Sequence, residues 1–269
     1  MPARLGLFVL LAGTLSGCTT NGPTPIPSHE EEHAAGLPVL RVVQTSTPPR
    51  LDGDLSDGAW RLAATTGPFV DTRSGGPARV SATAKALWDP LYLYVGVHVA
   101  DRWLVGPDTR QDSHLWEQDC VELMIRRPGE RGYFEIQVSP RGIVFDTRYD
   151  DRRVPAPFGH TAWKSEVRAA VSTQGEIDDR RSDAGYTVEI AIPWQAFSPA
   201  ESETRLPVVG GEWRANFFVL DRTQNGQQAS SWSPPRTGDF HVPSRFGTLR
   251  FAQPGKSRQQ RLESEEAPH

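Results

Sequence analysis

Short segments of alternating polarity dominate the sequence, and they constrain the fold more than any other feature. Every second residue from Leu91 to Val99 is aliphatic, which is the period of a strand with one buried face. Turn residues separate such segments, since the chain contains 24 Gly and 23 Pro. The pattern predicts strands at Val39–Gln44, Val80–Trp88, Leu91–Val99, Cys120–Ile125, Tyr133–Ser139, Ile143–Arg148, Thr161–Val171, Tyr186–Ile192, Ala215–Leu220, Ser230–Ser233 and Thr248–Phe251.

Helical patterns are scarce by comparison. Asp57–Ala63 is long enough for a turn or two, and Pro193–Phe197 for one turn that begins with proline. Many strands, few helices and frequent turn residues are typical of two packed sheets. We therefore expect an all-β fold, an antiparallel β-sandwich or jelly roll with one or two short helical turns.

The N-terminal segment has the features of a secretion signal. Arg4 precedes a short apolar run from Leu5 to Gly13, which is too short to cross a bilayer as a helix. The run leads to the sequence LSGC, which resembles the bacterial lipobox, in which the cysteine is lipidated and becomes the N-terminus. Residues 1–17 are thus predicted to be a lipoprotein signal peptide, with Cys18 carrying fatty acids such as palmitate.

The chain after the signal divides into three predicted parts. Residues 18–37 form a Pro/Glu-rich tether, residues 38–253 a single sandwich domain, and residues 254–269 a disordered polar tail. Thr19, rather than aspartate, follows the cysteine. This favours a lipid-anchored place in the cell envelope, at the outer membrane.

The charge balance argues against a nucleic-acid surface. Loss of the signal removes Arg4 and leaves 28 of the 29 basic residues against 33 acidic ones. A net negative domain does not attract nucleic acid or anionic lipid, so we expect membrane contact through the N-terminal lipid alone. The chain has two cysteines, and Cys120 has no partner, so a disulfide framework and a CxxC zinc site are excluded. Cys120 is expected to be a small buried side chain.

An acidic segment near the start of the domain is a candidate calcium site. Asp52, Asp54 and Asp57 cluster around two glycines in LDGDLSDGAW. An EF-hand needs glutamate at the twelfth position, where Ala63 stands, so that geometry is excluded. Two interpretations stay open: a structural Ca²⁺ in another geometry, and aspartates that form turns and cap the following helical turn.

One predicted strand, Cys120–Ile125, carries a carboxylate at its centre. Its aliphatic residues would face the core, while Glu122 faces the opposite side. Asp119 and Glu122 are three residues apart and would point to opposite faces, so they cannot act as a catalytic pair, whereas Glu122 with Glu135 stays open. No nucleophile elbow, phosphate loop or dinucleotide fingerprint occurs in the sequence, and an enzyme is the least favoured class.

Aromatic residues lie in or beside predicted loops rather than within the apolar alternation. They are Trp103, Trp116, Trp232 and Phe240. Aromatic rings cover the apolar face of a sugar ring, and carboxylates or amides bond its hydroxyls. Glu122 near a tryptophan fits that chemistry, although core packing is the commoner role of a single tryptophan.

An ordered series of motifs gives the chain a family resemblance. From about Val39 to Phe251 the sequence is similar to the family 9 carbohydrate-binding modules, a branch of the DOMON-like β-sandwiches. The motifs in order are LDGDLSDGAW, ALWDPLYLYVGVHVAD, LWEQDCVELMI, YFEIQVSPRG, GYTVEIAIPW, WRANFFVLDR, SSWSPP and FHVPSRFG. The resemblance implies a non-catalytic domain with structural calcium that holds a saccharide between two aromatic rings.

The resemblance also assigns roles by position. Trp116 matches one stacking ring, and Phe240 stands where the other ring is a tryptophan. Glu122 matches the carboxylate that bonds the sugar hydroxyls. Gln137 replaces an arginine, and Thr237 replaces an asparagine that bonds the sugar.

Asp101 matches an acidic residue near the site. Because the second ring and two polar partners differ, recognition of the reducing end of glucose or xylose is not implied.

Two other functions stay open. The lipoprotein could use its sandwich as a structural or adhesion scaffold for protein partners. Some DOMON-like domains bind haem through methionine with histidine or lysine, which here requires Met124 with His98 or Lys85. Glu122 shares the predicted face of Met124, and a carboxylate is unfavourable there, so no haem is expected.

Overall fold

The computed structural model describes residues 36–179, 181–198, 206–223 and 226–254 of the 269-residue chain. The predicted signal peptide, Cys18, most of the tether and nearly all of the tail lie outside these residues. Their assignments therefore stay predictions. Within the described ranges, the structure contains no helix long and apolar enough to cross a membrane.

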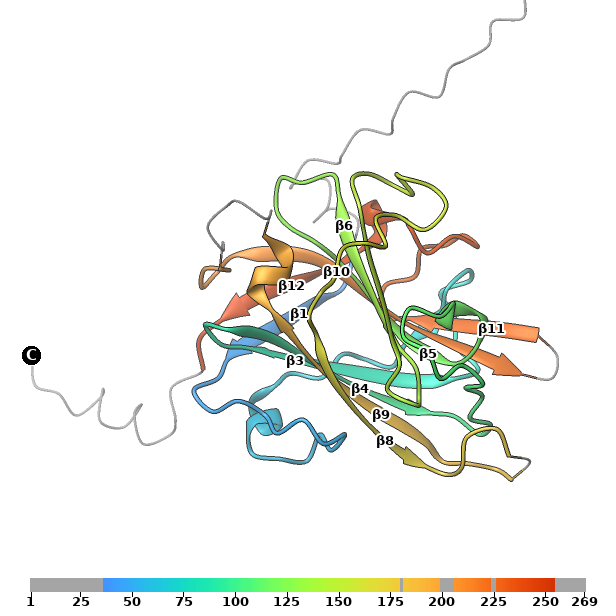
Figure 1. Cartoon of the computed structure of the whole chain (residues 1–269). Helices are drawn as coiled ribbons and strands as arrows, with labels where there is room; N and C mark the ends of the chain where they lie inside the picture. The colour runs from blue at the N-terminus through green and yellow to red at the C-terminus, as the bar shows by residue number, and fades with distance from the viewer. Residues whose placement is uncertain (1–35, 180, 199–205, 224–225, 255–269) are drawn as a thin grey trace, which may run out of the picture.

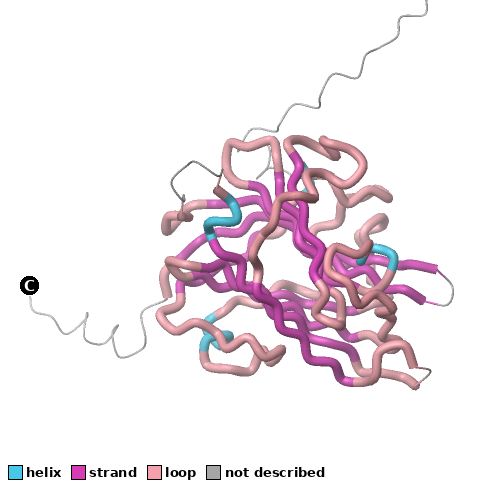
Figure 2. The backbone as a smooth tube through the Cα atoms, in the orientation of Figure 1, coloured by secondary structure: helices cyan, strands magenta, loops and turns pink. Residues whose placement is uncertain are grey.

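Strands make up nearly all the regular structure, as the alternation predicts, and the helical turns are short, isolated pieces (Figure 1, Figure 2). The strands of the described residues are β1 (Val39–Gln44), β2 (Val70–Asp71), β3 (Ser81–Trp88), β4 (Tyr92–Ala100), β5 (Cys120–Arg126), β6 (Tyr133–Val138), β7 (Val144–Tyr149), β8 (Arg168–Gln174), β9 (Gly185–Pro193), β10 (Glu212–Thr223), β11 (Gly226–Ser231) and β12 (Gly247–Ala252). The 3₁₀ turns are η1 (Ala59–Leu62), η2 (Leu115–Glu117), η3 (Trp194–Phe197) and η4 (Pro243–Arg245).

The fold class is confirmed, with two differences from the expectation. The described residues contain four helical turns rather than one or two, because η2 and η4 have three residues each and leave no periodic signal. β1 also lies parallel to both β12 and β3, so the sandwich is not antiparallel throughout. The two ends of the domain pair with each other through β1 and β12.

The strands form one hydrogen-bonded path that folds over into two layers (Figure 1). The path runs β7-β6-β5-β10-β12-β1-β3-β4-β9-β8, and β11 extends beside β10 and pairs with β2. The layer that contains β5, β6, β7 and β10 is called the first layer below. The layer of β3, β4, β8 and β9 is the second.

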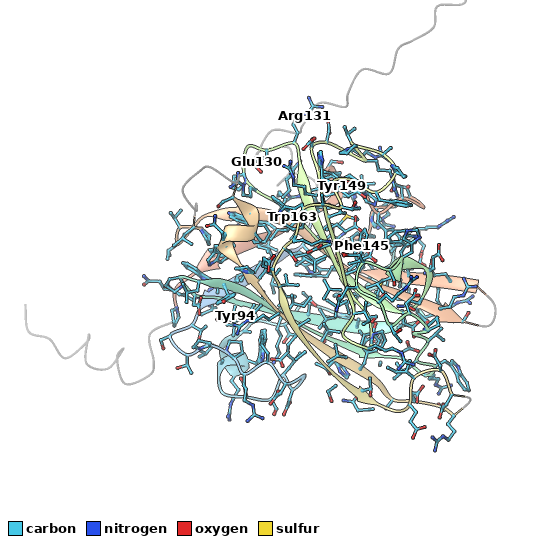
Figure 3. The ribbon with its side chains drawn as sticks, viewed as in Figure 1. Tyr94, Glu130, Arg131, Phe145, Tyr149 and Trp163 are labelled. Atoms are coloured by element: carbon cyan, nitrogen blue, oxygen red, sulfur yellow. The ribbon has the colours of Figure 1, made fainter. Side chains whose placement is uncertain are left out.

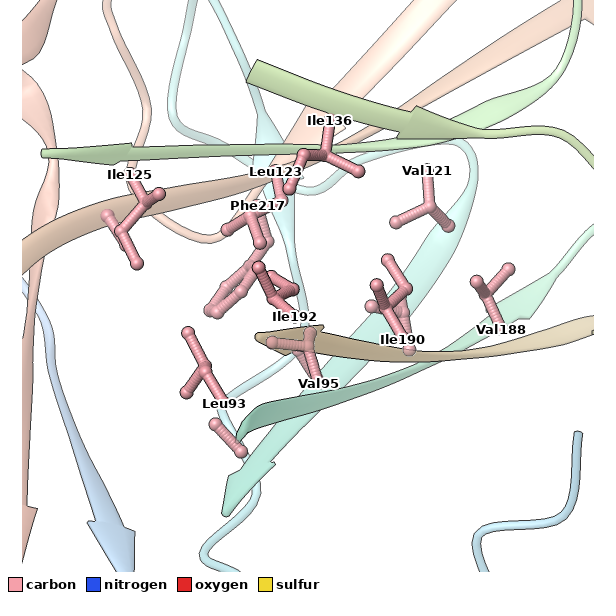
Figure 4. Packing of buried hydrophobic residues seen from close by; sticks show 14 of the residues in the cluster. Leu93, Val95, Val121, Leu123, Ile125, Ile136, Val188, Ile190, Ile192 and Phe217 are labelled. Carbon is pink, nitrogen blue, oxygen red and sulfur yellow. The ribbon is translucent and has the colours of Figure 1, made fainter. Parts of the chain in front are cut away.

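The main core lies between the layers (Figure 4). Val121 and Leu123 of β5 meet Leu93 and Val95 of β4 and Ile190 of β9, and all five are completely buried. Removing this apolar surface from water is the dominant stabilising contribution, at about 25 cal/mol per Å². The inward direction of the aliphatic residues in β5 confirms the predicted alternation.

Two predicted strands are displaced along the chain. Ser230–Ser233 is predicted where β11 runs from Gly226 to Ser231, and Thr161–Val171 is predicted where β8 runs from Arg168 to Gln174. Ser165 explains the difference at β8, because its backbone N–H and its hydroxyl both donate to Asp146 Oδ2, each at 2.6 Å. A backbone donor held by a side chain is not available to a strand ladder.

Candidate functional site

The polar candidates Glu122 and Gln137 meet on the outer face of the first layer. Glu122 of β5 lies opposite Gln137 of β6 in the antiparallel register, and both point away from the main core. Glu135 precedes Gln137 by two residues and shares that face. Although the face is an outer one, Glu122 and Glu135 are each only 3 % exposed. Something on this face therefore covers them.

A second apolar cluster provides the cover. Its buried members are Leu115, Cys120, Met124, Tyr133, Phe145, Tyr149, Phe218, Leu220 and Phe246. Phe145 and Tyr149 belong to β7, and Figure 3 shows both above Tyr94 of β4, which lies in the other layer. Cys120 is a free, buried thiol, as predicted, and burial raises its pKa well above the ordinary value. A thiol in that state is a packing group rather than a nucleophile.

Trp116 forms one wall of the site from the turn η2. Gln227 of β11 donates from its side-chain amide to the Trp116 carbonyl and ties the turn to the sheet. The His114 ring stacks on the indole with centroids 4.3 Å apart, and the Phe158 ring lies 5.1 Å from it. Because His114 and Phe158 are only 5.0 Å apart, both lie on the same side of the indole. Phe145 of β7 packs edge to face on the same indole, with centroids 5.1 Å apart.

Phe240 forms a second aromatic surface. Its ring stacks on Phe218 of β10, with centroids 4.7 Å apart and planes within 7°. Phe218 lies opposite Glu122 in the register of β5 and β10, so Phe240 is fixed close to the carboxylate. Trp116 and Phe240 thus form two aromatic walls of the site, and Glu122, Glu135 and Gln137 form its polar floor.

The walls and the floor enclose a pocket with a cavity volume of about 240 Å³. It brings together Trp116, Glu122, Gln137 and Phe240, four of the six predicted saccharide-binding residues. The other lining residues are Glu135, Phe145, Tyr149, Arg153, Pro157, Phe158, Leu220, Gln227, Gly238 and His241. A concave, largely aromatic site with a few convergent polar groups is typical of small-molecule binding.

The floor of the pocket holds two carboxyl groups joined by one amide. Gln137 Nε2 donates to Glu122 Oε2 at 2.9 Å and to Glu135 Oε1 at 2.6 Å. Burial raises the pKa of Glu122 well above its ordinary value, and the charge of Glu135 raises it further. Burial raises the pKa of Glu135 to about 7, against the lowering effects of Gln137, Arg153 and Tyr149. The pair can therefore accept hydrogen bonds or, when protonated, donate them.

The remaining charged groups of the pocket are paired or neutral. Arg153 donates to Asp239 Oδ1 from Nε at 3.1 Å and from Nη2 at 2.8 Å. Burial raises the pKa of Asp239, but the bonds from Arg153 and Arg152 bring it down to about 2. Burial, and then the charge of Arg153, lower the pKa of His241 to about 3, so this imidazole is neutral at pH 7. Its Nδ1 lies 2.7 Å from the Tyr133 hydroxyl oxygen.

The other two predicted residues, Thr237 and Asp101, do not line the pocket. Thr237 is exposed one residue before the lining Gly238, and its hydroxyl accepts from the Asp239 backbone N–H at 2.9 Å. Asp101 follows β4 of the second layer and is buried in a different cluster. The structure thus separates Asp101 from the carboxylate with which the resemblance grouped it.

That cluster consists of Asp101, Asp119 and Asp221, called the aspartate trio below. One carboxylate oxygen of each lies within 4.8 Å of the others. Burial, and then repulsion from Asp101, raise the pKa of Asp119 to about 8, and burial is also the largest cause that raises the pKa of Asp101 to about 6. Asp101 Oδ2 and Asp221 Oδ1 are buried without a hydrogen-bond partner. Three convergent carboxylates with free oxygens fit a hard cation such as Ca²⁺, because such ions prefer oxygen ligands.

The other candidate metal residues form turns. Each carboxylate accepts a backbone N–H two residues ahead, Asp52 from Asp54, Asp54 from Ser56 and Asp57 from Ala59, at 2.9 to 3.1 Å. These are the turn and capping bonds of the alternative interpretation. Among the described residues, their oxygens do not converge as those of the aspartate trio do.

The residues required for haem ligation lie on different layers. Met124 is buried on the outer face of the first layer. His98 of β4 lies 3.2 Å from the Thr187 hydroxyl, and Lys85 of β3 donates to the Trp60 carbonyl at 3.4 Å, both in the second layer. The main core separates Met124 from both, so the geometry does not support this alternative.

Several pocket residues are not predicted from the sequence as ligand-binding residues. The sequence leaves Glu135 open only as a catalytic partner of Glu122, although its spacing of two residues from Gln137 places both on one strand face. Tyr149 and His241 are ordinary strand-end and loop residues in the sequence. Arg153 and Phe158 come from the loop after β7, where no periodicity indicates which side chains turn inward.

The sequence profile described as "carbohydrate family 9 binding domain-like" matches residues 51–253. The chain belongs to this family. Among similar proteins, endo-1,4-beta-xylanase A of Thermotoga maritima is 31% identical over 210 residues, which cover 76% of this chain and 17% of the xylanase. Exoglucanase XynX of Acetivibrio thermocellus is 26% identical over 206 residues, 75% of this chain and 16% of the relative. The chain spans about a sixth of the length of these relatives.

Solved structures of similar fold include other family 9 modules. A candidate carbohydrate-binding protein of Bacteroides uniformis has a TM-score of 0.63 at 18% identity, with 80% of this chain and 99% of that chain covered. A family 9 module of Caldicellulosiruptor kristjanssonii in complex with cellotriose has a TM-score of 0.57 at 19% identity, with 82% of this chain and 96% of that chain covered. At these identities the likeness shows the family 9 fold.

Family 9 modules are non-catalytic, so this family 9 chain is a binding module and not an enzyme. The proximity of Glu122 and Glu135 therefore has to be explained by binding rather than by glycoside hydrolysis. The xylanase relatives match through the module alone.

Proposed function

We propose that the protein binds a saccharide non-covalently in the pocket between Trp116 and Phe240, with Glu122 and Gln137 bonding the sugar hydroxyls. The observation that carries the proposal is the union of two separate aromatic walls and a buried polar floor in one pocket. The Trp116 indole lines the pocket and offers an aromatic surface for the apolar side of a sugar ring. The family 9 module of C. kristjanssonii was solved in complex with cellotriose and with glucose, which supports the same ligand class here.

The test is a glycan array followed by calorimetry on the intact protein, with Trp116→Ala as the decisive variant. Loss of a central aromatic anchor is expected to weaken binding roughly tenfold or more. Trp103→Ala is the matched control, since Trp103 is 45% exposed and does not line the pocket. Unchanged binding by Trp116→Ala, or no binding of any saccharide by the parent protein, would refute the proposal.

A structural Ca²⁺ at the aspartate trio is part of the same proposal. Bound calcium would remove the repulsion among Asp101, Asp119 and Asp221 and use the oxygens that lack partners. Its contribution would be to stability, because none of the three lines the saccharide pocket. Direct measurement of calcium in purified protein, before and after chelation, tests its presence.

The lipid anchor is proposed on the sequence alone. Cys18 follows a signal-like segment and ends the LSGC motif. Metabolic labelling with palmitate and membrane fractionation should place the parent protein in the outer membrane. Cys18→Ser should remain unlabelled, and equal labelling of both would exclude this anchor.

A further inference from the structure

The two carboxyl groups of the pocket floor share the side-chain amide of Gln137 as a donor. A glutamine amide has two N–H bonds, and Gln137 spends one on Glu122 Oε2 and the other on Glu135 Oε1. Its donor capacity is therefore exhausted. The second oxygen of each carboxylate, Glu122 Oε1 and Glu135 Oε2, is buried and makes no hydrogen bond of ordinary geometry. A buried acceptor left without a donor costs about 1–3 kcal/mol, and more when charged.

The fold satisfies a buried structural carboxylate elsewhere, which makes this shortage notable. Glu189 in the second layer is fully buried and accepts from the backbone of Asp52 at 2.9 Å, the backbone of Gly53 at 2.6 Å and the indole N–H of Trp60 at 2.7 Å. Both of its oxygens are used. The pocket pair shares one amide nitrogen, and both residues line the pocket, so their second oxygens lack the donors that Glu189 has.

The described lining residues supply no cation that is free for these oxygens. Arg153 is the guanidinium of the pocket, and it is held by Asp239 through two hydrogen bonds. His241 places Nε2 3.8 Å from Glu135 Oε2 but is neutral at pH 7. Tyr149 lowers the pKa of Glu135 through a side-chain hydrogen bond, but its hydroxyl is neutral and does not cancel the effect of burial. The floor thus holds no cation that would favour the ionised form of the pair, and a cationic ligand would supply one.

The surroundings favour an organic cation over a metal ion. The rings of Trp116, Phe145, Tyr149 and Phe240 line the pocket, and ring faces attract ammonium groups. Ca²⁺ takes six to eight oxygen ligands. In the described residues, the pocket pair has no third acidic ligand atom beside it, in contrast to the aspartate trio.

We propose that the pocket selects a saccharide unit bearing a primary ammonium group, an amino sugar of the glucosamine type, with its ammonium between Glu122 Oε1 and Glu135 Oε2. This inference rests on the proposed saccharide-binding function of the same pocket. The ammonium group has three N–H donors, enough for both free oxygens with one to spare. An N-acetylated sugar lacks the charge and places a bulkier amide there.

Calorimetry on the intact protein can compare three matched trisaccharides: cellotriose, its free-amine counterpart the β-1,4-glucosamine trimer, and the N-acetylglucosamine trimer. The amine trimer should bind roughly tenfold tighter than cellotriose at low salt, because charge-assisted hydrogen bonds are stronger than neutral ones. The N-acetylated trimer should show no such gain.

Two variants test whether the preference for the amine trimer depends on the pocket floor. Glu135→Gln should reduce the advantage of the amine trimer over cellotriose to below roughly threefold, whatever it does to cellotriose itself. Gln137→Arg, which brings a cation to the floor, should remove the advantage independently if Glu135→Gln folds poorly. Glu117→Gln is the control, because Glu117 is next to Trp116 but 70% exposed and outside the lining. It should keep the full advantage.

The outcomes separate this inference from the function on which it rests. Binding of cellotriose with equal or weaker binding of the amine trimer overturns the amino-sugar inference and leaves saccharide binding intact. If Glu117→Gln loses the preference for the amine trimer over cellotriose to a similar extent, the inference is also overturned. The preference would then come from the overall negative charge of the surface and not from the pocket pair. Failure of all three trisaccharides, together with a blank glycan array, overturns saccharide binding itself.

Discussion

Two groups of buried carboxylates differ in which groups donate hydrogen bonds to their oxygens. In the pocket floor, Glu122 and Glu135 share the amide of Gln137 and lie under an aromatic-walled cavity. In the aspartate trio, Asp119 accepts backbone N–H groups from Val105 at 2.5 Å and Arg222 at 2.6 Å.

The difference indicates two uses for buried negative charge. Backbone N–H groups hold Asp119 and Asp101, and the Gln228 amide holds Asp221, so that the three carboxylates converge on one point, which suits a small ion. In the pocket, the side-chain amide of Gln137 joins the two carboxyl groups beside a space large enough for a ligand. The raised pKa values in both groups come mainly from burial, so geometry and not pKa distinguishes them.

The largest effect on stability is expected from calcium binding at the aspartate trio. Saturating calcium should raise the free energy of unfolding of the parent protein by about 2.7 kcal/mol at a hundredfold excess over the dissociation constant. Asp221→Asn should lose this gain, because it removes one charged ligand. Urea unfolding with calcium and with chelator measures both. Glu122→Gln is the matched change in the pocket pair, and loss of the calcium gain there would contradict the assignment.

A second experiment tests the raised pKa of Glu135 by measuring the free energy of unfolding at different pH values in protein without ligand. The folded pKa of Glu135 is about 7, above the ordinary 4.5, so the protonated form is favoured by folding. Its stabilising contribution is present below the unfolded pKa and is lost as pH rises through the folded one. The groups that face it are Glu122, Gln137, Tyr149, Arg153 and His241.

Relative to Glu135→Gln, the parent protein should therefore lose roughly 2 kcal/mol of unfolding free energy between about pH 5 and pH 7.5. Urea titrations of both proteins at the two pH values measure this difference. Glu117→Gln, an exposed carboxyl outside the pocket, should run parallel to the parent. Parallel curves for Glu135→Gln would show that Glu135 titrates normally.

The two carboxylate groups also show what the sequence could predict. Alternation within β5 is a local property, so it correctly placed Val121 in the core and Glu122 on the other face. The trio could not be predicted this way. Asp101, Asp119 and Asp221 are far apart in the sequence and meet only because the end of β4, the start of β5 and the last residues of β10 lie near one another. Periodicity within one strand carries no information about such a meeting.

The same limit applies to the pocket. Trp116 and Phe240 were proposed together through family resemblance, and the structure brings them to one cavity. The loop residues Arg153 and Phe158 were not foreseen, since loop conformation depends on tertiary contacts such as the ion pair of Arg153 with Asp239. Resemblance grouped Asp101 with the sugar site, whereas its position after β4 places it in the trio.

The smallest effect is expected at the third acidic group, Asp52, Asp54 and Asp57, which serves as the reference for ordinary turn carboxylates. Asp57 Oδ1 accepts from the backbone of Ala59 at 3.1 Å at the start of η1, so Asp57→Ala should cost about 1 kcal/mol, the usual loss of a cap. Asp52 forms an exposed ion pair with Arg50, and because exposed ion pairs contribute little to stability, Asp52→Asn should leave the urea midpoint nearly unchanged. Neither substitution should reduce the stabilisation by calcium. If either substitution abolished the stabilisation by calcium while Asp221→Asn did not, the calcium would bind to this segment. The aspartate trio would then not be the ion site.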